Sequence, residues 1–202
     1  MAYTVEEFKK LESKHGAYAT WAIWKQSKDR TDERDVACIE AALSDLNSNY
    51  VFVGLNISSP VSIWGNFRGG KHDRKLKYAL NNTSLRGSYM TDLFKNIVEP
   101  SSASFYKKVN GDSNLINENV QRFIEEMKDV KITSDSTFVI LGTENSYTGK
   151  LFNKHFKQHF PNNKVVYHRH YSSRGTDKEW VESCWKTLNV NASFENVFNS
   201  YQ

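Results

Sequence analysis

The segment YVFVGLN, residues 50–56, is a short and nearly continuous apolar run that ends at a glycine. A run of this kind is typical of a strand that is buried on both faces of a parallel sheet. The segments STFVILG (136–142) and KVVYHRH (164–170) have the same character, and GSYMTDLFK (87–95) is expected to contain a strand and its exit. The sequence therefore predicts a mostly parallel sheet of four strands.

Helical patterns separate these strands. The clearest is NLINENVQRFIEEMKDV, residues 114–130, in which apolar residues recur at helical spacing. Further helices are expected over residues 4–14, 32–47, 73–82, 145–159 and 177–190. The alternation of strands and helices predicts an α/β fold, in the form of a three-layer α/β/α sandwich around a central, mostly parallel four-stranded sheet.

The length and composition indicate one packed globular domain. We expect residues 1–202 to form that domain, with an N-terminal helical part (1–48), a core that carries the motifs (49–176) and a C-terminal helix (177–202). No apolar run approaches the roughly 20 residues that span a bilayer, and the first residues lack a secretory signal. Without a CxxC pair, Cys38 and Cys184 are expected to be reduced thiols of a cytoplasmic protein. The net charge of +4 is compatible with a polyanionic partner.

Right-handed crossovers bring the carboxyl ends of parallel strands to one edge of the sheet, where α/β proteins bind their ligands. The side chains at the predicted exits are an amide, a carboxylate, a histidine and hydroxyls: Asn56, Asp92, His170, Ser172 and Ser173. No GxGxxG, GxxxxGK[ST] or GxSxG motif accompanies the strands, which disfavours nicotinamide, nucleoside triphosphate and serine hydrolase chemistry. The remaining set suits a reaction in which a leaving group departs largely on its own and water is held ready, such as cleavage of an N-glycosidic bond.

Four segments carry a resemblance to a known family. VFVGLNIS, GSYMTDLFK, FVILGTENS and VVYHRHYSSRG resemble, in order and spacing, the motifs of the uracil-DNA glycosylase superfamily. The pairing of an asparagine in the first motif with a histidine in the last is most similar to the single-strand-selective monofunctional branch. There the last motif reads H-P-S-P-R, and here it reads HYSSR, residues 170–174. The resemblance covers roughly residues 50–176 and implies that glycosylase fold.

Three positions depart from the family pattern. Ile57, Tyr171 and Ser173 stand where the family usually has prolines, which stiffen the loops that press on the DNA backbone. Their loss affects the expected range of substrates and the expected activity.

The resemblance implies a role for each residue of the central motifs. Asn56 would position the attacking water, and His170 would donate a hydrogen bond to the carbonyl oxygen of the leaving base. Gly54 and Leu55 would shape the backbone of the base site, and Phe67 would stack on a flipped base. The structural alternatives are an asparagine that satisfies backbone groups at a strand end, and a histidine that caps a strand.

Other residues have expected roles in base recognition and DNA contact. Asp92 stands where related families often carry an asparagine that reads the uracil edge, and an ionised carboxylate accepts but cannot donate. Asp92 would then change base selection or serve as a cap. Trp64 is a rival to Phe67 for stacking. DNA contacts are expected from Ser58, Arg68, Lys71, Ser172, Ser173 and Arg174.

Three functions remain open from the sequence. The first is a monomeric DNA glycosylase that removes uracil or a related deaminated base from single- or double-stranded DNA, with no metal, no organic cofactor and no membrane partner. The second is a catalytically inactive nucleic-acid-binding module of the same fold, which the lost prolines and Asp92 favour. The third is a nucleoside- or nucleotide-processing enzyme that acts on free small molecules.

Overall fold

The computed structural model describes residues 3–95 and 97–201, and its centre is a five-stranded sheet. In chain order the strands are β1 (Thr20–Trp21), β2 (Asn47–Asn56), β3 (Ser88–Phe94), β4 (Thr137–Leu141) and β5 (Lys164–His168). They lie in the order β1-β3-β2-β4-β5, and β2 to β5 are parallel to one another. The predicted α/β fold with a mostly parallel sheet is confirmed. Residues 1, 2, 96 and 202 of the expected domain lie outside the described part of the chain.

The sheet has one strand more than the four that the sequence predicted. β1 pairs antiparallel with β3 at the sheet edge, with Thr20 opposite Met90. It is only two residues long, and the periodicity around it does not distinguish strand from helix. The Arg68 guanidinium donates to the main-chain oxygens of Trp21 and Ile23. A side chain therefore satisfies acceptors at this edge that a further strand would otherwise take.

Helices precede, connect and follow the strands. They are α1 (Val5–His15), α2 (Ala37–Glu40), α3 (Arg74–Leu80), α4 (Ser102–Val109), α5 (Ser113–Asp129), α6 (Tyr147–Leu151), α7 (Asp177–Leu188) and α8 (Phe194–Ser200). The capping box of Thr4 and Glu7 opens α1. α6 continues through a π-helical turn, Phe152–Phe156, into a 3-10 turn, Lys157–His159. The helix expected over 145–159 is therefore present in irregular form.

The N-terminal part is less helical than expected. Within the predicted helix 32–47 the structure has only a 3-10 turn, Thr31–Arg34, followed by the single turn of α2. The Asp35 carboxylate accepts a hydrogen bond from the Ala37 N–H (2.8 Å), and such local bonds compete with a continuous helix. The part expected to be helical therefore also contains β1 and the start of β2.

The C-terminal part is two helices rather than the one expected over 177–202. Thr176 and Glu179 form a capping box that opens α7. Asn189 then ends α7 in the left-handed conformation (φ 55°), a common end for a helix. Ser193 caps the start of α8.

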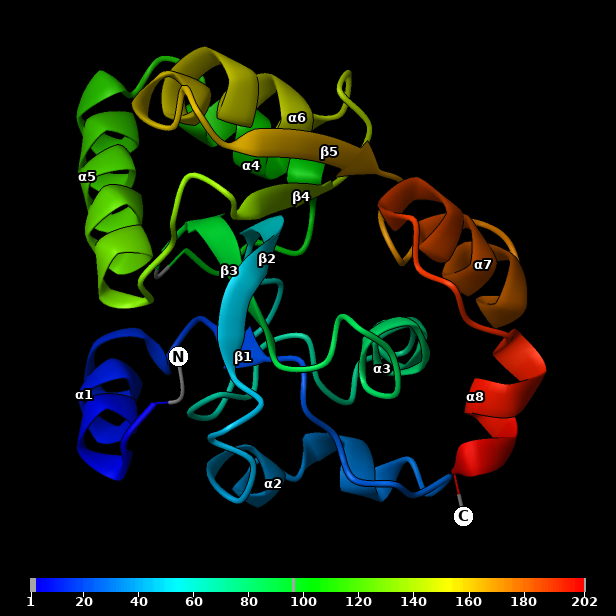
Figure 1. Ribbon diagram of the computed structural model, residues 1–202. Coiled ribbons are helices and arrows are strands. Elements are labelled where there is room, and N and C mark those ends of the chain that lie inside the picture. Colours follow the sequence, from blue (N-terminus) through cyan, green and yellow to red (C-terminus); the bar gives the residue numbers. More distant parts are fainter. Residues whose placement is uncertain (1–2, 96, 202) are drawn as a thin grey trace.

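Successive residues of β2 enter two separate cores. Val51 and Val53 belong to a core that includes side chains of α1 and α5, whereas Phe52 belongs to a second core with side chains of α3, α7 and α8. Figure 1 shows α1 and α5 to the left of the sheet and α3, α7 and α8 to its right. Both faces of the sheet are therefore covered, which explains why its strands are continuous apolar runs.

The strand order creates a switch point beside β2. The chain passes from β2 to β3 on one side and then crosses to β4 on the other. Loops that leave the two sides diverge, and in open α/β sheets this leaves a crevice at the carboxyl ends of the strands. Asn56 ends β2, Phe94 ends β3 and His168 ends β5, so the motif-bearing loops start from this edge.

A membrane-spanning helix is absent from the described residues: none of their helices is both long and apolar enough to cross a bilayer. Cys38 and Cys184 are free thiols. Burial raises the pKa of the Cys184 thiol to about 12, so this side chain behaves as an apolar core residue.

A buried ion pair joins β3 to α5. Lys95, which follows β3, lies 2.5 Å from Glu126 of α5 (Nζ to Oε2), and neither side chain is exposed. The same carboxylate accepts hydrogen bonds from the hydroxyls of Tyr89 (2.7 Å) and Thr91 (2.8 Å). The ammonium also lies over the ring of Tyr18. Since a buried charge is costly without its partner, each member of this network depends on the others.

Replacing Glu126 with glutamine is expected to lower the free energy of unfolding by about 3 to 5 kcal/mol, because Lys95 is left buried without a counter-charge. Glu125→Gln, on the exposed side of the same helix, is the matched control and should change it by less than about 0.5 kcal/mol. Urea unfolding followed by tryptophan fluorescence measures both. Equal unfolding midpoints for the two variants would contradict the role given to the pair.

Candidate functional site

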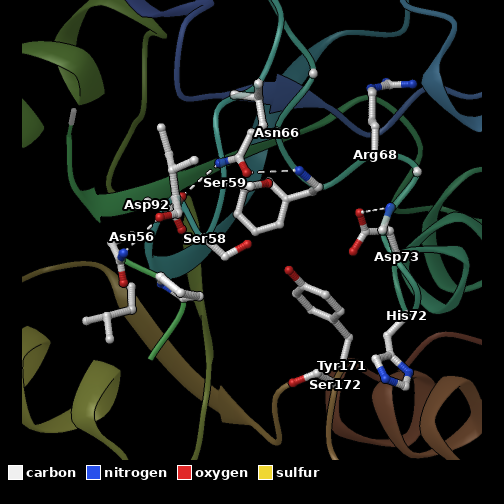
Figure 2. Close-up of a pocket in the computed structure, with 18 of the residues that line it drawn as sticks. Asn56, Ser58, Ser59, Asn66, Arg68, His72, Asp73, Asp92, Tyr171 and Ser172 are labelled. Carbon is white, nitrogen blue, oxygen red and sulfur yellow. Dashed lines mark hydrogen bonds between the residues drawn. The ribbon is translucent and has the colours of Figure 1, made fainter. Parts of the chain in front are cut away.

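A pocket of about 720 Å³ opens at the carboxyl edge of the sheet (Figure 2). Its walls come from β3, from the exit of β2 with the loop that follows it, and from residues 170–172 after β5. The candidate residues that line it are Leu55, Asn56, Ser58, Phe67, Arg68, Lys71, Asp92, His170 and Ser172. Gly54 underlies it, in contact range of Asp92 and Phe67, whereas Ser173 and Arg174 are not among its lining residues. Most of the candidates therefore meet at one place.

The Asn56 amide is held by the main chain. Its Nδ2 donates to the carbonyl oxygens of Ile57 (2.9 Å), Ile97 (3.2 Å) and Glu99 (2.9 Å). The structural role considered for this residue is thus confirmed, because the amide ties the end of β2 to the segment after β3. The same bonds fix the orientation of the amide, and no described residue donates a hydrogen bond to its Oδ1. Asn56 therefore offers a fixed acceptor, and the positioning of water stays a prediction.

His170 is oriented by the residue two positions later. Its Nδ1 lies 3.2 Å from the Ser172 backbone nitrogen, which donates to it, and 2.7 Å from the Ser172 hydroxyl oxygen. Because a backbone N–H can only donate, Nδ1 must be the acceptor, and the neutral ring carries its proton on Nε2. Burial, with a smaller contribution from His72, lowers the pKa of His170 to about 4. At neutral pH the side chain is therefore an uncharged donor through Nε2.

Asp92 lies at the floor of the pocket with its carboxylate almost fully buried. Its Oδ2 accepts a hydrogen bond from Asn66 Nδ2 (2.8 Å), as the dashed line in Figure 2 shows. The pKa of Asp92 is raised to about 7 by burial, which the Asn66 hydrogen bond and the charge of Lys95 only partly oppose. The capping role considered from the sequence finds no support in these contacts.

Asn66 lines the pocket beside Asp92, at a position that no sequence pattern identified. Its Nδ2 also donates to the Tyr18 carbonyl oxygen (2.8 Å), and its Oδ1 accepts from the Phe67 N–H (3.0 Å). The amide thus holds the loop after β2 against Asp92. A single asparagine in a loop of this length carries no pattern that would reveal the role.

Phe67 and Tyr171 meet inside the pocket. Phe67 has a left-handed backbone (φ 60°), and its ring is buried over Gly54. Tyr171 stacks on His170 with ring centres 4.2 Å apart and meets Phe67 edge-on with centres 6.2 Å apart. Figure 2 shows the Tyr171 ring pointing into the pocket, between Asn56 and Ser58 on one side and Asp73 on the other. The Tyr171 ring therefore occupies part of the pocket next to Phe67, the residue that the sequence resemblance implies would stack on a base.

Trp64 does not compete with Phe67 for stacking. Its ring is 1% exposed, packs on Phe8 with ring centres 5.6 Å apart and donates through Nε1 to Glu12 (3.0 Å). The rival role considered for Trp64 is therefore wrong, because its side chain belongs to the core beside α1.

The prediction that Arg68 contacts DNA is also wrong. Its guanidinium is buried, donates to the main-chain oxygen of Trp21 (2.8 Å) and to the Thr20 hydroxyl (2.9 Å), and lies over the Trp24 ring. Figure 2 shows the side chain pointing away from the pocket. Burial lowers the pKa of Arg68 to about 10. This arginine holds the β1 edge of the sheet and is not available to phosphate groups.

The rim of the pocket keeps several candidates accessible. Ser58, Lys71 and Ser172 are exposed and line the opening, and Arg174 is exposed beyond it. Ser173 is half-buried, and its hydroxyl makes no hydrogen bond to the described residues. Contacts of these five residues with DNA stay a prediction.

Lys75 of α3 fixes the loop that carries His170. Its ammonium is almost fully buried and donates to the carbonyl oxygens of Ser173 (3.3 Å) and Gly175 (3.2 Å). The sequence predicted only a helix at this position, and a basic residue in a helix is normally expected at the surface. The contact shows that α3 and the last motif form one structural unit.

Comparison with protein-family models, with curated proteins and with solved structures finds no match to this chain. The described residues contain no group of three or more His, Cys, Asp or Glu side chains placed to hold a metal ion. The pocket itself offers hydrogen-bond donors and acceptors, the rings of Phe67 and Tyr171, and the Asp92 carboxyl group, whose pKa burial raises to about 7.

Arg68→Ala is expected to lower the free energy of unfolding by about 3 kcal/mol, because main-chain acceptors at the β1 edge lose a charged donor. Arg174→Ala, which removes an exposed arginine, is the control and should leave stability within about 0.5 kcal/mol of the parent. Urea titration monitored by circular dichroism compares the three proteins. An unchanged unfolding midpoint for Arg68→Ala would contradict the structural role of this residue at the β1 edge.

Proposed function

We propose that this chain is a DNA glycosylase that hydrolyses the N-glycosidic bond of uracil or a related deaminated base. The observation that carries the proposal is that the main chain orients both Asn56 and His170, which line one pocket. One offers an amide oxygen as a fixed acceptor and the other offers an imidazole N–H as a fixed donor. An attacking water molecule needs such an acceptor, and a departing base needs such a donor.

His170 would act on the leaving base. As the bond to the sugar breaks, negative charge develops on the base and spreads to its carbonyl oxygen. A donor that already points at that oxygen stabilises the charge without reorganisation during the reaction. A neutral imidazole is sufficient, and the Ser172 N–H keeps its proton on Nε2, the nitrogen not occupied by Ser172.

Asn56 would act on the water. An amide oxygen accepts a hydrogen bond from water but cannot take its proton as a carboxylate can. Such a group suits a reaction in which the sugar cation forms first and water is captured afterwards. The three carbonyl groups that bind Asn56 Nδ2 would keep the oxygen in place during that step.

The fold supports the same proposal at a coarser level. A parallel sheet with helices packed on both faces and a pocket at its switch point agrees with the three-layer uracil-DNA glycosylase-like sandwich that the sequence resemblance implies. The exposed rim residues Ser58, Lys71, Ser172 and Arg174 would contact the DNA backbone. We propose a monomeric, cytoplasmic protein that needs no metal or organic cofactor.

One observation favours the second candidate, a nucleic-acid-binding module without excision. The Tyr171 ring lies in the pocket, edge-on to Phe67. A base that stacks on Phe67 would need this ring to turn aside, or would have to bind beside it. If Tyr171 stays in place, the rim can still bind a strand while the pocket excludes the base.

An excision assay tests the proposal. Oligonucleotides with one uracil, single-stranded or paired with guanine or adenine, are incubated with the protein, and abasic sites are cleaved with alkali. We expect strand breaks with the parent and a loss of about 10²-fold or more in rate for Asn56→Ala and for His170→Ala, because each removes an interaction with charge or water in the transition state. His159→Ala, an exposed histidine outside the pocket, is the matched control and should keep the parental rate.

Two outcomes would contradict the proposal. Salt-dependent DNA binding without strand breaks on any substrate would favour the binding module. The absence of both DNA binding and strand breaks would exclude the nucleic-acid function and leave an enzyme of free nucleosides.

A further inference from the structure

The two oxygens of the Asp92 carboxyl group have different surroundings. Oδ2 accepts the Asn66 hydrogen bond, and Asn66 is itself held by Tyr18 and Phe67. Oδ1 receives no hydrogen bond from the described residues and lies close to Gly54, and Asp92 is one of the residues that line the pocket. Oδ1 is therefore the atom that a bound base would meet.

No cationic side chain among the described residues pairs with this carboxyl group. The nearest ammonium, that of Lys95, contacts the main-chain oxygen of Asp92 and forms its ion pair with Glu126. The titratable and charged groups around Asp92 and in the pocket lining are Lys95, Glu126, Tyr18, Tyr171, Asp73, His72, His170, Arg34, Arg68, Lys71 and Glu99. A buried carboxylate without a counter-charge is costly, and the cost is relieved when the group takes up a proton.

The protonation state decides what Oδ1 can do for a base. A neutral acid can place its proton on Oδ1 and donate it to a carbonyl oxygen, while Oδ2 continues to accept from Asn66. An ionised group can only accept, and its charge would repel the negative charge that a departing base acquires. Apolar sites keep catalytic carboxylic acids neutral for this purpose in other enzymes.

We infer that Asp92 selects the base as a neutral carboxylic acid, whose Oδ1–H donates to a carbonyl oxygen on the base edge. This inference rests on the proposed glycosylase function and adds the group that would recognise the deaminated base. The substrates are bases with a carbonyl group where the corresponding undamaged base has an amino group, as uracil has in place of cytosine. An amino group at that position would place its N–H donor against the Oδ1–H donor of Asp92, and no hydrogen bond could form between them. The amide NH₂ of an asparagine would donate at every pH, whereas the Asp92 carboxyl group donates only when it is protonated.

The sign of the pH dependence follows from the raised pKa of Asp92, about 7. Below that pH the group is neutral and can donate, and above it the group is ionised. Single-turnover excision of uracil is therefore expected to fall by about tenfold per pH unit above pH 7. Asp92→Asn carries an amide that donates at every pH, and its rate should stay level up to pH 9.

The titration of Asp92 can be distinguished from that of the other histidine and tyrosine side chains in the pocket. His170 has a lowered pKa of about 4 and Tyr171 a raised pKa, so neither should titrate between pH 5.5 and 9. His72→Asn tests the remaining histidine of the lining and is expected to keep the midpoint near pH 7. The inference would be overturned if the midpoint of the pH–rate profile disappeared in His72→Asn or persisted in Asp92→Asn.

A binding measurement separates this inference from the proposed function. Fluorescence anisotropy compares single-stranded oligonucleotides with one 2′-fluoroarabino-uridine, which resists excision, or the matching cytidine analogue. The parent should prefer the uridine analogue below pH 7 and lose that preference above it, whereas Asp92→Asn should keep it at both. This result without any base release would refute the glycosylase and retain the role of Asp92. Base release at a rate that does not depend on pH, together with a preference for uridine that is the same below and above pH 7, would refute the role of Asp92 and retain the glycosylase.

Discussion

The floor of the pocket depends on the absence of a side chain at Gly54. A Cβ atom there would collide with Oδ1 of Asp92 and would lie 3.2 Å from the Phe67 ring. Only a glycine in the middle of this buried sheet lets a carboxyl group and an aromatic ring share the space above one residue. The close approach of the Asp92 carboxyl group and the Phe67 ring to this strand depends on that lack of a side chain, whereas the Lys95 ammonium is drawn to Glu126.

The central parallel strands β2 and β4 could be predicted because both of their faces are buried, which leaves apolar runs such as residues 50–56, and the half-buried edge strand β5 keeps enough apolar residues to be recognised. Strand β1 could not be predicted, since two residues define no period, and its edge is completed by Arg68 from a distant loop. The prediction of a continuous helix over 32–47 was wrong for a related reason. Its apolar stripe is real, but the local hydrogen bond between Asp35 and Ala37 shortens the helix.

The site was predictable to the extent that it follows from strand exits. Asn56, Asp92 and His170 were identified because parallel strands deliver their ends to one edge, and the pocket contains all three. Arg68 and Trp64 were misread because composition does not distinguish a basic or aromatic residue on a loop from one that folds beneath it. Asn66 and Lys75 donate to main-chain oxygens of residues far away in the sequence, and such contacts leave no trace in the spacing of residue types.

The hydrogen bond from the Ser172 backbone to His170 has a consequence for how the pocket could be controlled. The side of the imidazole ring that carries the proton is set by a peptide plane and not by solvent. Rotation of the single peptide unit between Tyr171 and Ser172 would withdraw that N–H and allow the proton to move to the opposite edge of the ring. A main-chain torsion would then exchange donor and acceptor at the site without altering its net charge.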